Sequence, residues 1–337
     1  MTTPSDEMQA LVLQRHGEPL RLTTVARPTL AAGQVLVRIH ASGVNPLDTK
    51  IMKGAAPHAR HPPPSILGLD LAGIVEAVSP EITAFHSGDE VFGMTGGVGG
   101  HQGSLAEFAA VDARLLALKP VNVGMREAAA LPLIFITAWE GIVDQAHVAS
   151  GQTVLVQGGA GGVGHIVVQI ARAFGAKIFA TCSAESAWIP ERFGATPIDY
   201  RTTPVEEYVE VHTQGRGFDI VYDTVGGPAL DASFKAVKRS GHVVSCLGWG
   251  THSLGPLSFR AAIYSGVFTL LPLLTGVGTE RHGEILREAA RLVEEGKLLP
   301  IVDPRRFTFA SAADAHAAVE ARMPGGKRII EISGSCP

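Results

Sequence analysis

The sequence predicts an α/β protein in which a β-rich domain accompanies a doubly wound domain with a parallel sheet. The chain has 337 residues, which suits two domains at about 150 residues each. Its first third contains short β-branched runs separated by Gly and Pro, a pattern typical of strands and turns. From residue 126 onward, strand and helix patterns alternate, as they do where crossover helices connect parallel strands.

The first domain is expected to consist mainly of short strands. Strands are predicted at 34–40, 73–78, 89–93 and 105–111. The end of the chain has a similar character, with a predicted strand at 306–309, a helix at 312–321 and a strand at 328–332. Because these last elements are too few to form a domain alone, we expect them to join the first one. The predicted domains are therefore 1–124 with 298–337, and 125–297.

The second domain is expected to alternate strands with helices. A helical stretch over 126–148 precedes predicted strands at 153–157, 177–181, 219–222, 241–245 and 266–271. Apolar residues at a period near 3.6 predict a helix at 163–174, and a strong helical pattern covers 280–295. The most apolar segment, 266–277, is interrupted by Pro272 and is shorter than the ~20 residues that span a bilayer. We interpret it as a buried strand and its continuation.

Composition and charge exclude several classes of protein. The hydrophobic content of 46% argues against disorder, and Cys182, Cys246 and Cys336 are too few for a disulfide framework or a four-cysteine zinc site. The net charge of −4, without a basic run, argues against nucleic acid or an anionic membrane as a partner. The first eight residues are polar and acidic where a secretory signal would be basic and then apolar. We expect a cytoplasmic protein with reduced thiols and a small-molecule partner.

A glycine-rich segment provides the strongest functional signal. A predicted strand leads into Gly158, Gly161 and Gly164, and a helix with an apolar face follows at once. Glycines at this spacing let the backbone turn tightly and approach a pyrophosphate, whose charge is stabilised by free N–H groups and the helix N-terminus. We predict dinucleotide binding by Gly158, Gly161, Gly162, Val163 and Gly164. The alternative is an ordinary tight turn between a strand and a helix.

The end of the next predicted strand indicates which dinucleotide is bound. NAD sites place Asp or Glu there for the ribose 2′-hydroxyl, whereas NADP sites lack the carboxylate and supply donors or cations for the 2′-phosphate. Here the strand ends in Thr181, Cys182 and Ser183, and the first acid is Glu185. A carboxylate would repel the phosphate, so its absence favours NADP(H). The alternative is that Ser183 only caps the following helix.

Together with motifs spread over nearly the whole chain, these residues resemble the zinc-independent quinone oxidoreductases (the zeta-crystallin group) of the medium-chain dehydrogenase/reductase superfamily. The motifs are 43–48 (GVNPLD), 68–73 (GLDLAG), 88–93 (GDEVFG), 103–108 (GSLAEF), 131–132 (LP) with 137–139 (TAW), the glycine loop, 223–227 (DTVGG) and 326–327 (GK). The resemblance implies a GroES-like catalytic domain plus a Rossmann domain. It also implies a homodimer joined through the last Rossmann strand, around 266–271.

The resemblance also implies that neither zinc site of the related alcohol dehydrogenases can be built. Those enzymes place a ligand Cys where this sequence has Asn45 and a ligand His where it has Leu69. The four cysteines of their structural zinc loop have no counterpart here. His58 and His61 could suggest a metal pair, but they lie in a Pro-rich segment that we interpret as a solvated loop. No metal is expected.

Several residues are assigned to the cofactor by resemblance alone. Ser183 and Tyr200 would lie at the adenosine 2′-phosphate. Relatives often carry a Lys after this serine, where the chain has Ser186, so Arg192 or Arg201 would have to replace that cation.

The nicotinamide end is also assigned by resemblance. Thr137 and the backbone around Val225, Leu247 and Gly248 would line the nicotinamide, and Lys327 would approach it from the end of the chain. Without this family context, a lysine in a loop before a strand is commonly solvated.

These assignments imply hydride transfer from NADPH to a quinone or an α,β-unsaturated carbonyl compound. Such acceptors delocalise the arriving charge onto oxygen, so the protein needs positioning and hydrogen-bond donors but no metal. Asn45 is the leading candidate donor, and the alternative is that it only holds a turn before Pro46. Members of the group commonly carry Tyr and Arg where this chain has Lys50 and Met52, so Lys50 could be another donor.

Two further interpretations stay open from the sequence. The chain could bind NADPH with little turnover, as crystallin relatives suggest, or it could be a zinc alcohol dehydrogenase with displaced ligands. The loop 249–264 carries Trp249, Phe259 and Tyr264, which either shape the substrate pocket or serve as core or dimer contacts.

Overall fold

A computed structural model describes residues 6–332, so Cys336 and the two ends of the chain lie outside the described residues. The chain divides into two compact units, Met1–Leu133 with Leu270–Pro337, and Ile134–Thr269. We call them the first unit and the second unit. Both mix helices with strands, which confirms the predicted α/β class.

The first unit contains two β-sheets. The strands of the larger sheet are β3 (Gln34–Gly43), β5 (Asp70–Val78), β6 (Glu90–Met94), β7 (Phe108–Asp112), β8 (Leu116–Leu118), β15 (Phe307–Thr308) and β16 (Ile329–Glu331). Their order is β15-β16-β3-β5-β6-β8, and β7 also pairs with β3. The smaller sheet consists of β1 (Glu7–Leu13), β2 (Arg21–Ala26) and β4 (Ser65–Ile66), in the order β2-β1-β4. Since β16 pairs with β3, the end of the chain returns to this unit.

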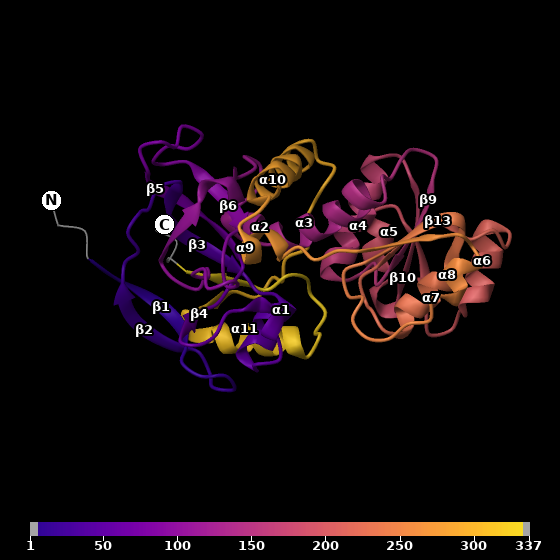
Figure 1. Ribbon diagram of the computed structural model, residues 1–337, viewed down its shortest axis with the longest axis horizontal. Coiled ribbons are helices and arrows are strands. Elements are labelled where there is room, and N and C mark those ends of the chain that lie inside the picture. The colour runs from indigo at the N-terminus through magenta and orange to yellow at the C-terminus, as the bar shows by residue number, and fades with distance from the viewer. Residues whose placement is uncertain (1–5, 333–337) are drawn as a thin grey trace. The chain divides into compact units, whose positions relative to one another are not determined.

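Helices connect and cover these sheets. They are α1 (Pro46–Met52), α2 (Met125–Ala129), α9 (Leu271–Thr275), α10 (Thr279–Glu294) and α11 (Ala312–Glu320), with one-turn helices η1 (Pro57–Ala59), η2 (Ala113–Leu115) and η5 (Phe309–Ser311). Helix α11 packs against α1, and Figure 1 shows the two side by side. Helix α3 (Pro132–Trp139), which follows α2 in the chain, begins in the first unit and ends in the second.

The second unit is built on a six-stranded parallel sheet. Its strands are β9 (Thr153–Gln157), β10 (Lys177–Cys182), β11 (Thr196–Asp199), β12 (Phe218–Asp223), β13 (Val237–Ser245) and β14 (Ile263–Gly266), in the order β11-β10-β9-β12-β13-β14. Numbered within the unit this order is 3-2-1-4-5-6, the Rossmann arrangement. From β9 to β11 successive strands are added on one side of β9, and from β12 to β14 they are added on the other side. Ligands of such sheets bind where the order switches, between β9 and β12, beyond the carboxyl ends of the strands.

Helices cover this sheet on both sides, as expected for right-handed crossovers. They are α4 (Gly162–Ala173), α5 (Trp188–Arg192), α6 (Val205–Thr213), α7 (Pro228–Ala236) and α8 (Gly255–Ser258), with η3 (Glu140–Gln145) and η4 (Ala184–Ser186). Helix α4 packs against β9 and β10, and α7 packs against β12 and β13 (Figure 1). The face of α4 toward the sheet consists of buried Ile166, Val167, Ile170 and Ala171, which the apolar periodicity predicted.

Two predictions for single elements were wrong. The expected strand at 266–271 lies earlier, at Ile263–Gly266, and 271–275 forms α9. Pro272 explains the change, because proline has no N–H for a sheet and suits the first turn of a helix. The apolar segment is also not buried as a whole, since Leu271 is 53% exposed. The helix expected over 126–148 is broken into α2, α3 and η3, with Leu131 before Pro132 interrupting it.

The compact units divide the chain differently from the expected domains, because 125–133 and 270–297 lie in the first unit. Helix α10 packs against β6, β8 and η2 with buried residues that include Ile285, Leu286 and Leu292. Gly283 allows the close approach, since a Cβ there would overlap the Arg114 carbonyl oxygen. The sequence pattern predicted this helix but not the sheet on which it packs. None of the described helices is long and apolar enough to cross a membrane.

Candidate functional site

The glycine loop forms a tight cradle after β9. Gly158 has a φ of +74°, in the left-handed region that favours glycine. A Cβ at Gly164 would overlap the Gly158 carbonyl oxygen, so the loop and the first turn of α4 touch backbone to backbone. Gly161 occupies the N-cap of α4, and Gly162 and Val163 follow in its first turn. The first N–H groups of a helix have no partner within it and are positioned to bind a pyrophosphate.

A buried carboxylate organises the loops after β12 and β13, next to this cradle. Asp223 is fully buried and accepts hydrogen bonds from the Val225 and Gly226 N–H groups, at 3.1 and 3.0 Å. The Ser245 hydroxyl donates to Asp223 at 2.7 Å and accepts from the Leu247 N–H at 3.0 Å. Asp223 therefore fixes the backbone that was assigned to the nicotinamide. Sequence reasoning noted the DTVGG motif but assigned this carboxylate no role.

Polar side chains gather beyond β10 and β11, on the other side of β9. The Ser183 and Ser186 hydroxyls are 3.1 Å apart. The Tyr200 N–H donates to the Cys182 carbonyl oxygen at 3.3 Å, which brings Tyr200 to the residue before Ser183. The Tyr200 side chain is 58% exposed. Ser183 occupies the N-cap position of η4, but its side chain makes no capping hydrogen bond, so the capping alternative is not supported.

A cation belongs to this polar group. Arg201 makes an ion pair of 3.2 Å with Glu185, and its guanidinium lies 5.9 Å from the centre of the Tyr200 ring. The other arginine considered for this role, Arg192, lies at the end of α5 over the ring of Phe193. Of the two arginines, Arg201 is therefore the one in contact with the group around Ser183 and Tyr200. In that ion pair its positive charge lies against the Glu185 carboxylate.

In the first unit, three polar side chains from distant parts of the chain form a buried cluster. Asn45 follows β3, Asp70 begins β5, and Lys327 precedes β16. The Asn45 side-chain amide donates to Asp70 Oδ2 at 2.9 Å, while Lys327 Nζ donates to Asp70 Oδ2 at 3.1 Å and to Asn45 Oδ1. The Lys327 side chain is only 7% exposed, so the solvated alternative for this lysine is not supported. The ammonium is held between an amide oxygen and a carboxylate.

A second carboxylate lies at the edge of this cluster. Asp48, in α1, is 1% exposed and accepts the Asn45 backbone N–H at 2.7 Å. Burial raises the pKa of Asp48 to about 7, a rise that the Asn45 N–H and Lys327 limit and the Asp70 carboxylate reinforces. Burial also raises the pKa of Asp70, against the lowering effects of Lys327 and Asn45. The cluster therefore holds one cation and two carboxyl groups whose pKa values burial raises.

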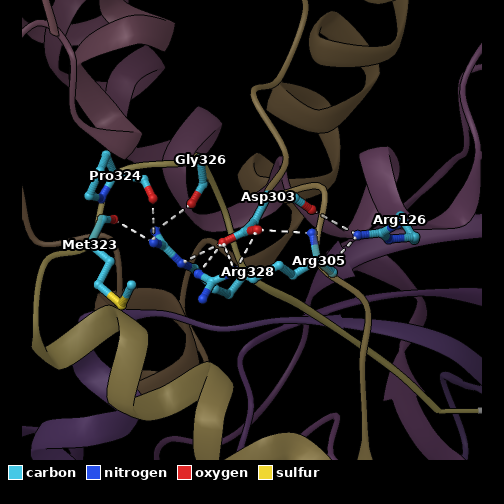
Figure 2. A network of polar contacts seen from close by, with 7 residues as sticks. All are labelled: Arg126, Asp303, Arg305, Met323, Pro324, Gly326 and Arg328. Atoms are coloured by element: carbon cyan, nitrogen blue, oxygen red, sulfur yellow. Dashed lines mark hydrogen bonds and ion pairs between the residues drawn. The ribbon is translucent and has the colours of Figure 1, made fainter. Parts of the chain in front are cut away.

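A network of arginines fixes the loop that carries Lys327. Figure 2 shows Arg328 donating to the carbonyl oxygens of Gly326 and Pro324, at 2.7 and 3.0 Å. Arg328 also contacts the buried Asp303 carboxylate at 3.1 Å. The Asp303 backbone N–H donates to the Lys327 carbonyl oxygen at 2.9 Å. Both the backbone and the side chain of Lys327 are thus held in place.

The residues at the family's zinc-ligand positions do not fit a metal. Asn45 is committed to Lys327 and Asp70, and Leu69 is a fully buried apolar residue. Residues 6–332 contain no group of three or more His, Cys, Asp or Glu side chains that could hold a metal ion. The interpretation of His61 as a solvated residue was wrong, because this side chain is 6% exposed and bonds the Ile66 carbonyl oxygen at 3.0 Å.

Two other predicted catalytic residues do not join the buried cluster. Lys50 is exposed in the last turn of α1 and has no hydrogen bond or ion pair through its ammonium with any described residue. Thr137 belongs to the second unit, where its hydroxyl lies 3.1 Å from that of Thr269 and its carbonyl oxygen accepts the Tyr222 hydroxyl. Sequence reasoning missed Asp48 and Asp70 as members of the site, although both lie inside motifs that it quoted. An acid within an apolar run, as in GLDLAG, was the available signal.

A Rossmann sheet with a glycine cradle at its switch point, in a chain that also contains a β-rich unit, is typical of nicotinamide-dependent oxidoreductases. Residues 31–121 match the family described as "Alcohol dehydrogenase GroES-like domain", and residues 193–330 match "Zinc-binding dehydrogenase". The chain belongs to the medium-chain dehydrogenase/reductase superfamily, in its zinc-independent quinone-oxidoreductase-like group. The resemblance found in the sequence is thereby confirmed.

Two relatives cover 96% of the chain and are themselves covered over 79% of their length. They are the 2-methylene-furan-3-one reductase of Solanum lycopersicum, 36% identical, and the chloroplastic NADPH-dependent alkenal/one oxidoreductase of Arabidopsis thaliana, 33% identical. A solved alcohol dehydrogenase superfamily protein from Novosphingobium aromaticivorans is 58% identical, with a TM-score of 0.95 over 97% of this chain and all of its own. The quinone oxidoreductase from Coxiella burnetii is 26% identical, with a TM-score of 0.80 over the same shares of the two chains.

Proposed function

We propose that the chain is an NADPH-dependent reductase that transfers hydride to an α,β-unsaturated carbonyl compound or a quinone without a metal. The observation that carries the proposal is the Lys327 ammonium, held by Asn45 and Asp70 in the region where zinc relatives have metal ligands. A fixed positive charge can stabilise an oxygen that becomes negative during hydride transfer. Two relatives named as reductases of such acceptors support the same chemistry.

The proposed cofactor is NADPH, and the described residues fit it. A Cβ at Gly164 would overlap the Gly158 carbonyl oxygen, so glycine there lets the loop pack closely on the start of α4, where the free N–H groups are proposed to bind the pyrophosphate. Ser183, Tyr200 and Arg201 would bind the 2′-phosphate, with Arg201 taking the place of the absent Lys. When bound, NADPH supplies the hydride. The backbone fixed by Asp223, together with Thr137, is proposed to position the nicotinamide.

The protein's own residues are proposed to stabilise the negative charge that develops on the carbonyl oxygen of the acceptor. In the proposed reaction, hydride would add to the electron-poor carbon of the acceptor, the electron pair of the C=C bond would move toward the carbonyl oxygen, and a proton from solvent would complete the reduced product. Lys327 Nζ has three hydrogens, and within residues 6–332 it contacts two acceptors. The third hydrogen is proposed to bind the acceptor oxygen. Lys327 is therefore the proposed electrophile of the first unit.

Asn45 is proposed to act through Lys327. Its side-chain amide hydrogens point to Asp70 Oδ2 at 2.9 Å and to the Gly43 carbonyl oxygen at 3.4 Å. Its oxygen accepts from the ammonium. The expected direct contact of Asn45 with substrate stays a prediction, but these contacts favour a positioning role. The exposed Lys50 is proposed to bind substrate groups farther from the reacting carbons.

A homodimer is proposed to form through β14. This strand is at the edge of the second unit's sheet, and Ile263 and Tyr264 are 56% and 38% exposed. An exposed apolar edge strand favours pairing with another strand, and a second copy offers a matching one. Trp249 and Phe259, which the sequence left as residues of the substrate pocket, the core or a dimer contact, are 56% and 86% exposed. Sedimentation of wild-type protein and of Ile263→Lys tests this assembly, with a dimer expected only for the wild type.

A panel of acceptors with both reduced cofactors tests the proposed function. The purified protein is assayed against quinones, enals, enones and simple ketones, with NADPH and with NADH. We expect reduction of the conjugated acceptors with NADPH and little activity on simple ketones. More efficient oxidation of NADH would overturn the cofactor, and tight NADPH binding without turnover would favour a binding protein.

A further inference from the structure

A hollow in the second unit is lined mainly by cations and lies away from the proposed NADPH site. It has a volume of about 550 Å³ and is lined by Gly215, Arg216, Lys238, Arg239, Phe259 and Arg260. We propose that this hollow, here called the basic hollow, binds a small organic phosphate of nucleotide size. The inference goes beyond the proposed function and does not depend on it.

The basic hollow lies at the amino ends of the strands, whereas the cofactor loops lie at their carboxyl ends. Its residues come just before β12, at the beginning of β13, and between α8 and β14. The glycine loop and Asp223 are instead at the carboxyl ends of parallel strands. The six residues of β12 separate these two ends by roughly 20 Å, at about 3.3 Å per residue. A ligand in the basic hollow would therefore occupy a site separate from the one proposed for NADPH.

The side chains that line the basic hollow carry only positive charge, although the chain is acidic overall. Four of its six lining residues are Arg or Lys and none is acidic, whereas the chain has a net charge of −4. Lys238 is paired with Asp219, outside the lining. The Arg239 guanidinium has no hydrogen bond or ion pair with any residue in the described range, and the side chain is exposed. An unpaired guanidinium among other cations favours an anion as the missing partner.

The side chains of the other two arginines are held in place by hydrogen bonds to backbone carbonyl oxygens. Arg260 donates to the Pro256 and Lys235 carbonyl oxygens, at 3.1 and 3.0 Å. Arg216 donates through Nε to the Thr213 carbonyl oxygen at 3.2 Å, leaving its terminal nitrogens without a described partner. The guanidinium groups are thus oriented before any ligand binds. Such preorganisation lowers the entropic cost of binding an anion.

The backbone is irregular at this position. The pairing of β12 with β13 passes from Phe218 with Val237 to Ile220 with His242, so several residues of β13 bulge outward. Lys238 and Arg239 are in this bulge, which also contains Ser240 at a φ of +54°. A non-glycine residue at positive φ is strained, and bulges commonly redirect side chains near functional sites. The bulge is what separates the Lys238 and Arg239 side chains from the regular ladder.

The size of the basic hollow and its one aromatic residue indicate the ligand class. About 550 Å³ is within the range of roughly 300–1,000 Å³ that small-molecule sites occupy, which suits a nucleotide better than a polymer. Phe259 is 86% exposed and offers a flat face to a base beside the cations. Arginines bind phosphate oxygens in paired geometry. Adenosine diphosphate and pyrophosphate are suitable probes, one with a base and one without.

Calorimetry on the full chain, kept loaded with excess NADP⁺ to fill the cofactor site, tests the proposal. We expect adenosine diphosphate and pyrophosphate to bind, more weakly at high salt. Arg239→Glu should weaken both by about tenfold or more, because it reverses an unpaired charge. Arg287→Glu, an equal charge change on the exposed side of α10, is the matched control and should leave binding within about twofold.

Phe259→Ser tests the aromatic part separately. We expect it to weaken adenosine diphosphate but not pyrophosphate, and sedimentation checks that the assembly is unchanged. The proposal is overturned if neither probe binds the NADP⁺-loaded protein, or if Arg239→Glu and Arg287→Glu weaken binding equally. Equal losses of both probes in Phe259→Ser would overturn the nucleotide assignment. NADPH turnover should be unchanged in Arg239→Glu, so this proposal and the proposed function can fail independently.

Discussion

The two functional regions of this chain are built in opposite ways. The cofactor loop of the second unit uses glycine backbone that is contiguous in sequence, from Gly158 to Gly164. The buried cluster of the first unit uses side chains that are far apart, since Asp70 and Lys327 are separated by 257 positions. Backbone amides bind phosphate with little dependence on the rest of the chain, whereas the cluster depends on the pairing of β16 with β3.

This difference separates binding from chemistry. A defect in the glycine loop should mainly affect NADPH binding, because the loop contributes shape and N–H groups. A defect in the cluster should affect both stability and turnover, because buried charges must stay paired. The following substitutions test the contrast, from the largest expected effect to the smallest.

Lys327→Met should cause the largest loss of stability. It leaves the Asp70 carboxylate buried without its cation, and breaking a buried pair commonly costs about 3–5 kcal/mol. Urea unfolding of the NADPH-free protein measures the change. Lys53→Met is the matched control, because Lys53 pairs with Glu320 at the surface and should cost less than about 1 kcal/mol. Equal losses in the two variants would contradict the special role of the buried cluster.

Asp48→Asn should change the pH dependence of stability. The folded state raises the pKa of Asp48 from 3.8 to about 7, so the neutral carboxyl is favoured. Its contribution is complete below the unfolded pKa and is lost as pH rises toward about 7. Wild-type protein should therefore lose several kcal/mol relative to Asp48→Asn across this interval, and the difference should be constant above it. Unfolding series at stepped pH measure it, and parallel profiles for both proteins would argue against a buried neutral Asp48.

Gly164→Ala should disturb the cofactor region only. Its methyl group would overlap the Gly158 carbonyl oxygen, and such overpacking commonly costs about 1–3 kcal/mol. NADPH affinity should fall by about tenfold or more because the cradle is displaced. Gly162→Ala is the control, since its methyl group would lie 3.6 Å from Ile134 in ordinary contact. Fluorescence titration with NADPH compares them, and similar affinities would contradict a close backbone cradle.

Arg201→Ala should have the smallest effect, confined to cofactor choice. Losing a charge-assisted contact to the 2′-phosphate should reduce the preference for NADPH over NADH by about tenfold. Arg192→Ala should leave that preference unchanged, because Arg192 contacts Phe193 instead. The ratio of kcat/KM for the two cofactors measures both variants. An unchanged ratio in Arg201→Ala would remove this arginine from the site.

The same contrast explains what the sequence could predict. The strands and α4 around the glycine loop were predictable because periodicity and glycine spacing are local signals. The Asn45–Asp70–Lys327 contacts were not, because no local pattern shows which distant strands pair. Resemblance named Asn45 and Lys327 separately, and only the fold shows that they bind each other.

The prediction for the apolar segment 266–277 was wrong for a related reason. Hydrophobicity alone predicted a buried strand at 266–271, but the edge strand β14 ends at Gly266, and Leu271 begins α9 with 53% of its surface exposed. Helix α10 was predicted correctly as a helix, yet its packing partner is set by contacts that periodicity does not contain. Local structure is therefore the more predictable part, and assembly is the less predictable part.

Asn45→Ala tests the central claim most directly, when kcat and the NADPH dissociation constant are measured side by side. The variant removes the amide oxygen that holds Lys327 but leaves the glycine loop untouched. We expect kcat on an enone to fall by about tenfold or more while NADPH affinity changes by less than about twofold. An unchanged kcat, or an equal loss of NADPH affinity, would contradict the separation of cofactor binding from oxyanion stabilisation.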